Sequence, residues 1–379
     1  MRVEQRQWSR PGGWNVIRAD PQAADAQLVL FFGSREAIAE GAPQRALREA
    51  YPKASLVGCS TAGEICGTEV ADDTVVATAM RLERSSVRSV CRSLTDATES
   101  RRVGEALAKD LVHAGLAHVF VIAEGLRVNG SELVEGLRLG LPAHVAITGG
   151  LAGDGARFER TTVVHQTEQV EGAVVAIGFY GEHFRVGYGS MGGWDPFGPD
   201  RLITRSAGNI LYEFDGRPAL ELYKSYLGPH AHELPSSGLL FPLSLRRADG
   251  GPRVVRTILG VDEEAGSLIF AGGVPEGDYA QLMKANVDRL IDGAHGAASA
   301  CVAPMSEGTA DLAVLISCVG RKLVLKQRVE EEVESVRDVL GPGTVLSGFY
   351  SYGEIAPFST SAKCELHNQT MTITTFSER

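Results

Sequence analysis

Three carboxylates in this sequence follow a glycine in short turns, each after an apolar run. Glu64 stands in GCSTAGEI, Asp154 in GGLAGDG and Glu354 in GFYSYGEI. Paired carboxylates can do acid–base chemistry, and a single one can hold the amine or hydroxyl group of a ligand. Each could equally accept backbone N–H groups and fix its own tight turn. For each residue taken singly the structural role is favoured, but we expect at least one of the three to contact a ligand.

Glycines surround these carboxylates and extend the predicted pocket. Glycine lets the backbone approach a ligand closely, and a few polar groups in apolar walls are typical of a binding cavity. We therefore expect the turns at 58–65, 149–155 and 348–355 to line or border the principal cavity. Besides the carboxylates, the residues assigned to this pocket are Gly58, Gly63, Gly149, Gly150, Tyr352 and Gly353.

Cys59 lies in the first turn, where it could act as a nucleophile. Covalent catalysis needs a base that activates the thiol, and no histidine stands near Cys59 in the sequence. Phe349 occupies the matching position of the third turn, so the turn does not require a thiol. A buried packing role is therefore favoured, and we expect neither a catalytic residue nor an enzyme.

Two sets of histidines could bind a metal. His230 and His232 form an HxH pair in an expected loop, without a third partner at motif spacing. His367 lies in CELHNQTMTITTF, near the third turn. There a period of two places one set of side chains on a single strand face: Glu365, His367, Gln369, Met371 and Ile373. A histidine on this face could be an axial ligand of haem. More commonly, such a histidine has only a structural role and hydrogen-bonds to other groups of the protein.

The turns belong to a repeated pattern of strand, helix and strand. Short apolar runs alternate with helical segments over 26–65, 117–155 and 310–355, which is typical of βαβ-type units around a buried sheet. The first unit contains an expected helix over 35–52. The Gly-Glu-Ile triplet that the first and third units share indicates internal duplication.

Further strand-like runs follow the turns, at 74–82, 161–165 and 364–376. A weaker relative of the repeat stands at 266–273, before an expected helix over 279–292. These patterns predict an α/β fold with two lobes and mixed sheets, built from internally duplicated strand-helix-strand units. The predicted boundaries are an N-terminal extension over 1–25, a first lobe over 26–215 and a second lobe over 216–379.

Composition narrows the function classes. Of 379 residues, 37 are Lys or Arg and 47 are Asp or Glu, so the net charge of −10 gives no general attraction to nucleic acid or anionic lipid. No apolar run approaches the roughly 20 residues that span a bilayer, and no signal peptide is evident. The six cysteines are scattered without a CxxC pair, which favours neither disulfides nor a zinc site. We expect a soluble, cytoplasmic protein.

Several segments in order resemble the FIST sensory domain, in both its N-terminal and C-terminal parts. They are FFGSREA (31–37), VGCSTAGEI (57–65), EGLRVNGSEL (124–133), TGGLAGDGARFERTTV (148–163), GFYSYGEIAP (348–357) and LHNQTMT (366–372). The resemblance implies a bacterial intracellular sensor of signal transduction that binds a small ligand, with amino acids proposed for the family at large.

Two further segments, at 187–209 and 219–243, resemble the stand-alone NosP group of nitric-oxide-responsive haem proteins. That resemblance implies b-type haem and regulation of a partner histidine kinase or of a cyclic-di-GMP enzyme, either a diguanylate cyclase or a phosphodiesterase. His367 is the first choice for the axial ligand, with His230 and His232 as alternatives.

The leading hypothesis is thus haem-based nitric oxide sensing. One alternative is a sensor of a small polar metabolite, such as an amino acid, without haem. A hydrolase or transferase that uses Cys59 or the Gly-Glu turns is a more distant one. The sequence leaves a homodimer open.

Overall fold

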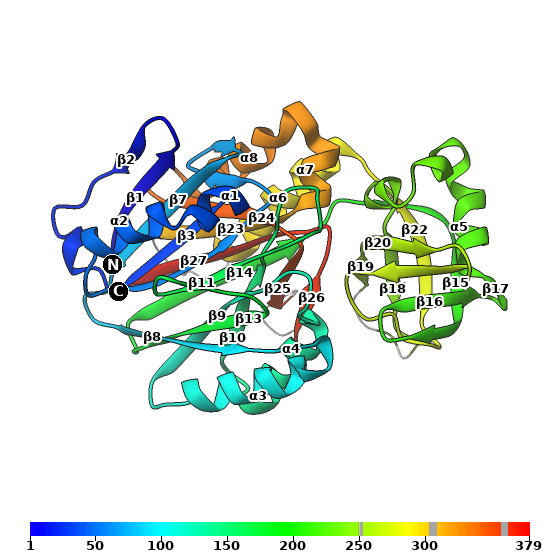
Figure 1. Ribbon diagram of the computed structural model, residues 1–379, viewed down its shortest axis with the longest axis horizontal. Coiled ribbons are helices and arrows are strands. Elements are labelled where there is room, and N and C mark those ends of the chain that lie inside the picture. Colours follow the sequence, from blue (N-terminus) through cyan, green and yellow to red (C-terminus); the bar gives the residue numbers. More distant parts are fainter. Residues whose placement is uncertain (249, 251–252, 303–308, 358–362) are drawn as a thin grey trace.

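Four β-sheets, divided between a large and a small lobe, form the framework of the described chain (Figure 1). The computed structural model describes all residues except 249, 251–252, 303–308 and 358–362. Both ends of the chain contribute to the large lobe, and residues 195–284 form the small one. The α/β class, the mixed sheets and the division into two lobes are confirmed, and the parallel strand pairs of the described residues lie in the large lobe.

The three sheets of the large lobe repeat one strand pattern. The first sheet is, in order, β12 (Glu168–Val170), β11 (Val163–His165), β4 (Ser55–Ser60), β3 (Leu28–Gly33), β7 (Thr74–Arg81), β1 (Arg2–Ser9) and β2 (Gly13–Arg18). The second is β26 (Cys364–His367), β25 (Gly353–Pro357), β10 (Ala146–Leu151), β9 (Leu116–Ala123), β13 (Ala173–Tyr180) and β8 (Ser86–Ser93). The third is β6 (Glu69–Ala71), β5 (Glu64–Cys66), β24 (Val345–Ser351), β23 (Leu312–Cys318), β27 (Met371–Glu378) and β14 (Phe184–Met191).

Each of these sheets exchanges a strand with its neighbour. A parallel pair lies at the centre of each sheet, namely β3 with β4, β9 with β10, and β23 with β24. After the Gly-rich turn the chain leaves its own sheet and pairs with the central strand of another: β5 with β24, β25 with β10, and β11 with β4. The repeat is therefore threefold, and the three turns lie where the sheets meet.

Aromatic side chains fill the space between the three sheets. The rings of Phe32 and Phe349, from the first and third sheets, have centroids 4.6 Å apart. Phe120 of the second sheet meets Phe376 of the third, with centroids 6.1 Å apart. All four are fully buried. Such burial stabilises the fold by about 1.5–3 kcal/mol per large apolar side chain, which explains the apolar runs of the central strands.

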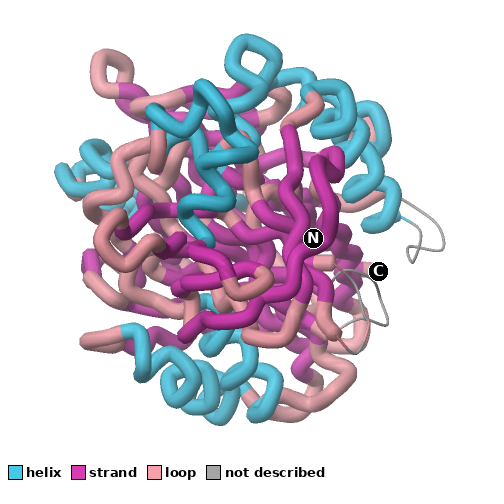
Figure 2. Tube along the Cα trace, turned by 90° about the vertical axis from the view of Figure 1, so that its right-hand side faces the viewer, coloured by secondary structure: helices cyan, strands magenta, loops and turns pink. Residues whose placement is uncertain are grey.

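Helices cover the outer faces of these sheets, and the strands form the interior (Figure 2). The α-helices of the large lobe are α1 (Arg35–Glu40), α2 (Ala42–Ala50), α3 (Ser100–Leu111), α4 (Gly130–Gly140), α6 (Val287–Val302), α7 (Val319–Leu325) and α8 (Val329–Leu340). Short 3₁₀ turns are η1 (Ala23–Asp25), η2 (Ala97–Glu99) and η5 (Lys326–Arg328). In α8, Val333, Val336 and Leu340 are buried, as the helical period predicts.

The small lobe is an antiparallel sheet with one α-helix, α5 (Ala219–Leu227), inserted between β14 and α6. Its strands are, in order, β19 (Val254–Arg256), β18 (Leu243–Arg246), β22 (Tyr279–Lys284), β15 (Asp195–Ala207), β16 (Ile210–Phe214), β21 (Ser267–Phe270) and β20 (Ile258–Asp262), with β17 (Arg217–Pro218) beside β16. The turns η3 (Gly228–Glu233) and η4 (Ser236–Leu239) follow α5.

The predicted boundaries differ from the separation of the lobes in space. Residue 215 lies within the small lobe, because β15, β16 and β17 hydrogen-bond to one another across it. The segment 1–25 contains β1 and β2, and β1 pairs with β7 along its whole length, so these residues belong to the first sheet. Backbone pairing between distant segments decides both points.

Three local predictions are wrong. The expected helix over 35–52 is divided at Gly41, whose φ of 70° ends α1. Of the expected helix over 279–292, the first part is strand β22, because its backbone pairs with both β15 and β18. The strand-like segment 266–273 contains β21, which pairs only within the small lobe and has no place in the threefold repeat.

Among the described residues, no helix combines the length and the apolar character that crossing a membrane requires.

Candidate functional site

The three Gly-rich turns interlock where the sheets of the large lobe meet. Each turn receives a backbone hydrogen bond from another: Ala62 N donates to Tyr350 O (2.8 Å), Gly153 N to Ser60 O (2.9 Å) and Tyr352 N to Leu151 O (3.3 Å). The duplication seen in the sequence thus brings the predicted site segments together. Their backbone groups bind one another.

Glu64 fixes its own turn. Its side chain, 1% exposed, accepts hydrogen bonds from the hydroxyl of Thr61 (2.5 Å) and from the backbone N and hydroxyl of Thr74 (3.1 and 2.8 Å). Burial raises the pKa of this carboxyl to about 7, against the lowering effect of these donors. The structure shows the local role that the sequence favoured for this residue.

Glu354 repeats this arrangement in the third turn. It is fully buried and accepts from the hydroxyl of Ser351 (2.8 Å) and from the backbone N and hydroxyl of Thr370 (3.2 and 2.9 Å). Burial raises its pKa to about 8, and the same donors lower it. The matching donors confirm that Glu64 and Glu354 occupy equivalent positions of the repeat.

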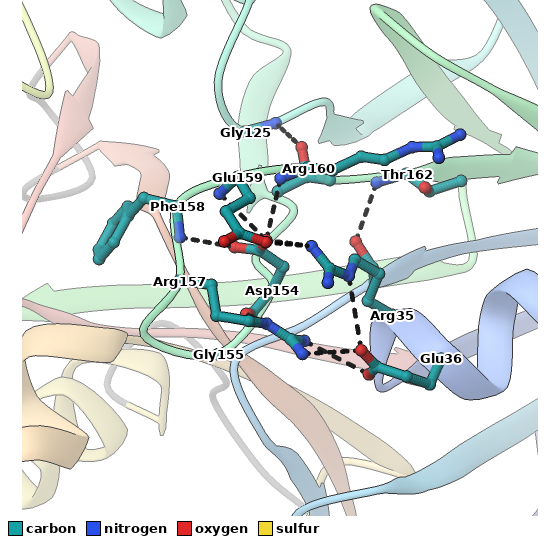
Figure 3. A network of polar contacts seen from close by, with 12 residues as sticks. Arg35, Glu36, Gly125, Asp154, Gly155, Arg157, Phe158, Glu159, Arg160 and Thr162 are labelled. Carbon is teal, nitrogen blue, oxygen red and sulfur yellow. Dashed lines mark hydrogen bonds and ion pairs between the residues drawn. The ribbon is translucent and has the colours of Figure 1, made fainter.

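Asp154 organises a longer turn (Figure 3). Its fully buried carboxylate accepts from the backbone N of Phe158 (3.0 Å), Glu159 (3.1 Å) and Arg160 (2.9 Å). The guanidinium of Arg35, in the first turn of α1, binds the same carboxylate at 3.1 Å. Three N–H donors and one cation hold this loop in a single conformation.

Tyr352 joins the third turn to this loop. Its hydroxyl donates to the carboxylate of Asp154 and accepts from the backbone N of Phe158 at 3.1 Å. Its ring stacks on that of Phe158, with centroids 4.3 Å apart and planes 16° from parallel. The predicted pocket residues Asp154 and Tyr352 are therefore in contact, and together they set the position of Phe158.

Phe158 faces an apolar cavity of about 420 Å³ at the junction of the lobes. The walls combine the ordered loop, helix α7 and the small lobe: Ala156, Arg157, Phe158, Leu323, Pro235, Leu239, Ile258 and Leu259. Arg157 is held at the edge, since its guanidinium bonds Glu36 at 2.7 and 3.3 Å. The volume lies within the range of about 300–1,000 Å³ that is typical of ligand pockets.

Several of the predicted pocket glycines approach protein atoms. A Cβ on Gly58 would lie 2.3 Å from the carbonyl O of Phe31, and one on Gly149 1.9 Å from that of Val121. The close approach that requires glycine is thus to the neighbouring strand of the parallel pair.

At Gly63, Gly150 and Gly353 the nearest atoms belong to side chains instead of a neighbouring backbone. A Cβ there would lie 2.3 Å from Lys322 Nζ, 2.7 Å from Ile316 Cγ2 and 3.1 Å from Leu366 Cδ1, respectively. None of the five predicted glycines is among the residues lining the 420 Å³ cavity. Ligand contact by these residues stays a prediction.

The surroundings of His367 do not fit an axial haem ligand. The residue is 1% exposed, and its Nε2 lies 2.7 Å from the carbonyl O of Ala356. The backbone of His367, on β26, pairs with that of Glu354 on β25. Burial lowers the pKa of His367 to about 4. The predicted strand face is also interrupted, since Gln369 has a φ of 64° between β26 and β27.

His230 and His232 lie on the exposed turn η3 of the small lobe. The ring of His230 is near Phe241, with centroids 5.4 Å apart, and its Nδ1 lies 3.7 Å from Glu233. Within the described parts of the chain, no three His, Cys, Asp or Glu side chains are grouped to hold a metal ion. An exposed turn offers no enclosed site for a macrocycle.

Cys59 is packed in the core. It is fully buried on β4, and burial raises the pKa of its thiol well above the ordinary value. A thiol that stays protonated is a poor nucleophile. This placement supports the packing role expected from the sequence.

Family models match most of the chain. A FIST N domain model matches residues 27–217, and a FIST C domain model matches residues 219–357. The chain belongs to the FIST family. FIST domains are sensory domains of signalling proteins, which supports a role in small-ligand sensing. The change from FIST N to FIST C lies beside the boundary predicted near 215.

Relatives of this chain include uncharacterized proteins of bacteria and archaea. An uncharacterized protein of Mycobacterium tuberculosis is 27% identical over 236 residues, 59% of this chain and 59% of the relative. An uncharacterized protein of Methanocaldococcus jannaschii is 24% identical over 65% of this chain and 51% of the relative. The chain thus spans less than two thirds of the length of these relatives. A cyanuric acid hydrolase from A. caulinodans matches at 11% identity over 78% of this chain and 99% of its own, with a TM-score of 0.19.

The sequence did not single out the cavity lining of this FIST protein. Ile258 and Leu323 come from segments without a recognisable motif, and Leu239 lies in the NosP-like segment 219–243, where nothing marked it as a pocket residue. Phe158 could have been predicted as a lining residue, because it stands four residues after Asp154 in a segment that resembles the family. An aromatic residue next to a turn-forming carboxylate is the one signal that could have identified it.

Proposed function

We propose that this FIST protein senses a small, largely apolar ligand that binds between its two lobes, and that it transmits the binding to a partner signalling protein. The cavity of about 420 Å³ carries the proposal, because both lobes and the Asp154 loop contribute its walls. Burying apolar ligand surface there gains roughly 25 cal/mol per Å². This gain in binding free energy requires that the two lobes stay in the relative position that forms the cavity.

A largely apolar ligand fits better than a small polar metabolite. Seven of the eight lining side chains are aliphatic, aromatic or proline, and the eighth, Arg157, is already paired with Glu36. The carboxyl groups of Glu64 and Glu354 each accept three hydrogen bonds, one from their own turn and two from Thr74 or Thr370. An amino-acid ligand at those turns would have to displace these bonds.

The junction between the lobes offers a route for the signal. Gln369, in the turn between β26 and β27, donates to the carbonyl O of Leu239 at 3.2 Å, and Leu239 lines the cavity. The backbone O of Gln369 accepts from the indole of Trp194 at 2.8 Å, where the chain enters the small lobe. A ligand that favours one arrangement of these contacts shifts the population of lobe positions. That shift is the proposed output.

Haem-based nitric oxide sensing, implied by the resemblance to the NosP group, finds no support at His367. An axial ligand needs a nitrogen that faces open space, whereas this ring is buried and its Nε2 is bound to the carbonyl O of Ala356. A histidine kinase or a cyclic-di-GMP enzyme remains the proposed partner, as the family resemblance implies. The proposed action is non-enzymatic and cytoplasmic.

The test is binding of the neutral apolar dye Nile red, followed by fluorescence. We expect saturable binding to the intact protein, competition by small apolar compounds and loss of binding in Leu323→Trp, which fills the cavity from α7. Leu139→Trp is the matched control, since Leu139 is 60% exposed on α4. Equal binding to both variants would contradict the proposed site. A Soret band on titration with haemin that persists in His367→Ala would show haem bound elsewhere.

A further inference from the structure

Arg256 is a buried cation that is not paired with an acid. It ends β19 of the small lobe and is 7% exposed. Its Nε donates to the carbonyl O of Gly273 (3.1 Å), and its Nη1 to those of Leu366 (2.9 Å) and Val255 (3.4 Å). Among the residues that the structure describes, no carboxylate forms an ion pair with it. Its partners within the described part of the chain are neutral carbonyl groups.

Such an arrangement is costly without a further partner. A charge taken out of water is usually paired, because its desolvation is strongly unfavourable. Burial lowers the pKa of Arg256 to about 10, with Glu365 acting in the opposite direction, so the side chain is still charged at neutral pH. Glu365, an acid that affects this pKa, is bonded to Arg247 at 3.0 Å. No carboxylate of the described residues therefore serves as a direct counter-charge to Arg256.

Arg256 faces a cavity of about 120 Å³ between α4, β26 and the small lobe. The lining consists of Ser131, Val134, Glu135, Arg138, Arg247, Arg256, Cys364, Glu365 and Leu366. Arg138 is paired with Glu135 at 2.7 Å. Three arginines therefore face two glutamates, and the excess charge is that of Arg256.

Ser131 provides a second, independent sign of a missing ligand. It stands in the first turn of α4, and its Oγ is buried without a hydrogen-bond partner. A buried hydroxyl without a partner is uncommon, because the lost hydrogen bond with water lowers stability. Ser131 and Arg256 line the same cavity from opposite lobes.

We propose that this second cavity binds a small anionic group, either a carboxylate or a phosphate. Arg256 supplies the charge and a planar pair of donors that suits such oxygens, and Ser131 supplies a hydroxyl donor. The cavity volume of about 120 Å³ is enough for one carboxylate or phosphate group. The anion joins the large and small lobes and is separate from the apolar cavity.

The test compares anions at equal ionic strength. We expect sodium phosphate or sodium acetate to raise the melting temperature of the intact protein above that in sodium chloride, with saturation. Titration calorimetry with each anion then identifies which of the two binds more tightly. Arg256→Gln should weaken that binding on the order of tenfold or more. Arg246→Gln is the matched control, because Arg246 is a neighbouring, more exposed arginine bonded to Asp200 at 3.3 Å.

Ser131→Ala covers the case in which Arg256→Gln does not fold. It removes only the hydroxyl, and we expect several-fold weaker anion binding with unchanged folding. The proposal is wrong if neither anion exceeds chloride, or if binding is equal in the intact protein and in the Arg256 and Ser131 variants. Nile red binding reports separately on the apolar cavity, so failure of one site is distinguishable from failure of the other.

Discussion

The guanidinium of Arg321 donates to the carboxylate of Glu332, with Nη2 and Oε2 2.7 Å apart, and both side chains are fully buried. The same guanidinium donates to the carbonyl O of Gly192 (2.6 Å) and of Leu290 (2.7 Å), which lie on the two chain segments that lead to and from the small lobe. Glu332 also accepts from the hydroxyl of Tyr350 at 2.6 Å. This one pair ties the third Gly-rich turn to the base of the small lobe.

Removing one partner of this pair should destabilise the protein strongly. In Glu332→Gln the buried charge of Arg321 loses its counter-charge, and we expect the free energy of unfolding to fall by about 3–5 kcal/mol. Urea denaturation measures the change. Arg328→Gln, which removes an exposed ion pair with Glu331, is the control and should change stability far less. A similar fall in the free energy of unfolding of both variants would show that the buried pair stabilises the protein no more than the exposed one.

The raised pKa of Glu354 makes stability depend on pH. The unfolded carboxyl loses its proton near pH 4.5, whereas the folded one keeps it up to about pH 8. The free energy of unfolding should therefore fall as the pH rises from about 4.5 to 8. Glu354→Gln removes this pH dependence. The free energy of unfolding of the variant, relative to that of the unaltered protein, should therefore rise as the pH goes from about 4.5 to 8. Denaturant titrations at several pH values measure it, with the exposed Glu264→Gln as control.

Gly348 tests the close approach within the parallel strand pairs. A Cβ at this position would lie 1.9 Å from the carbonyl O of Leu315 on β23. We expect Gly348→Ala to destabilise the protein by about 1–3 kcal/mol, because the two strands must separate. In Gly343→Ala, where a new Cβ meets no atom within 4 Å, the melting temperature should scarcely change. Thermal unfolding of the two variants gives the comparison directly.

Cys59→Ala should leave ligand binding intact. The thiol is buried on β4 and lines neither proposed cavity, so only packing is lost, at a cost of about 1 kcal/mol. Nile red titration and thermal unfolding test the two parts of this prediction. A stoichiometric covalent adduct at Cys59 with a substrate would overturn the packing role and favour an enzyme.

Much of the large lobe could be predicted from local sequence. The central strands are continuous apolar runs that alternate with helical periods, and the shared Gly-Glu-Ile triplet revealed the repeat. Glu64 and Glu354 proved equivalent, because each accepts a hydrogen bond from a hydroxyl residue that stands three positions before it in its own turn. This spacing can be seen in the sequence. Helix ends and strand β22 were missed, because a left-handed Gly41 and cross-strand pairing override local propensity.

The sequence alone therefore determined the family, the α/β class and the turn residues Glu64, Asp154 and Glu354, because these depend on contacts between residues close together in the chain. Only the tertiary structure decided where a ligand could bind. One cavity is lined by Phe158, Leu239 and Leu323, and the other by Ser131 and Arg256. Within each of these two sets, more than 70 residues of sequence separate any two members. Strand exchange and the insertion of the small lobe bring them together, and no local pattern encodes such long-range pairing.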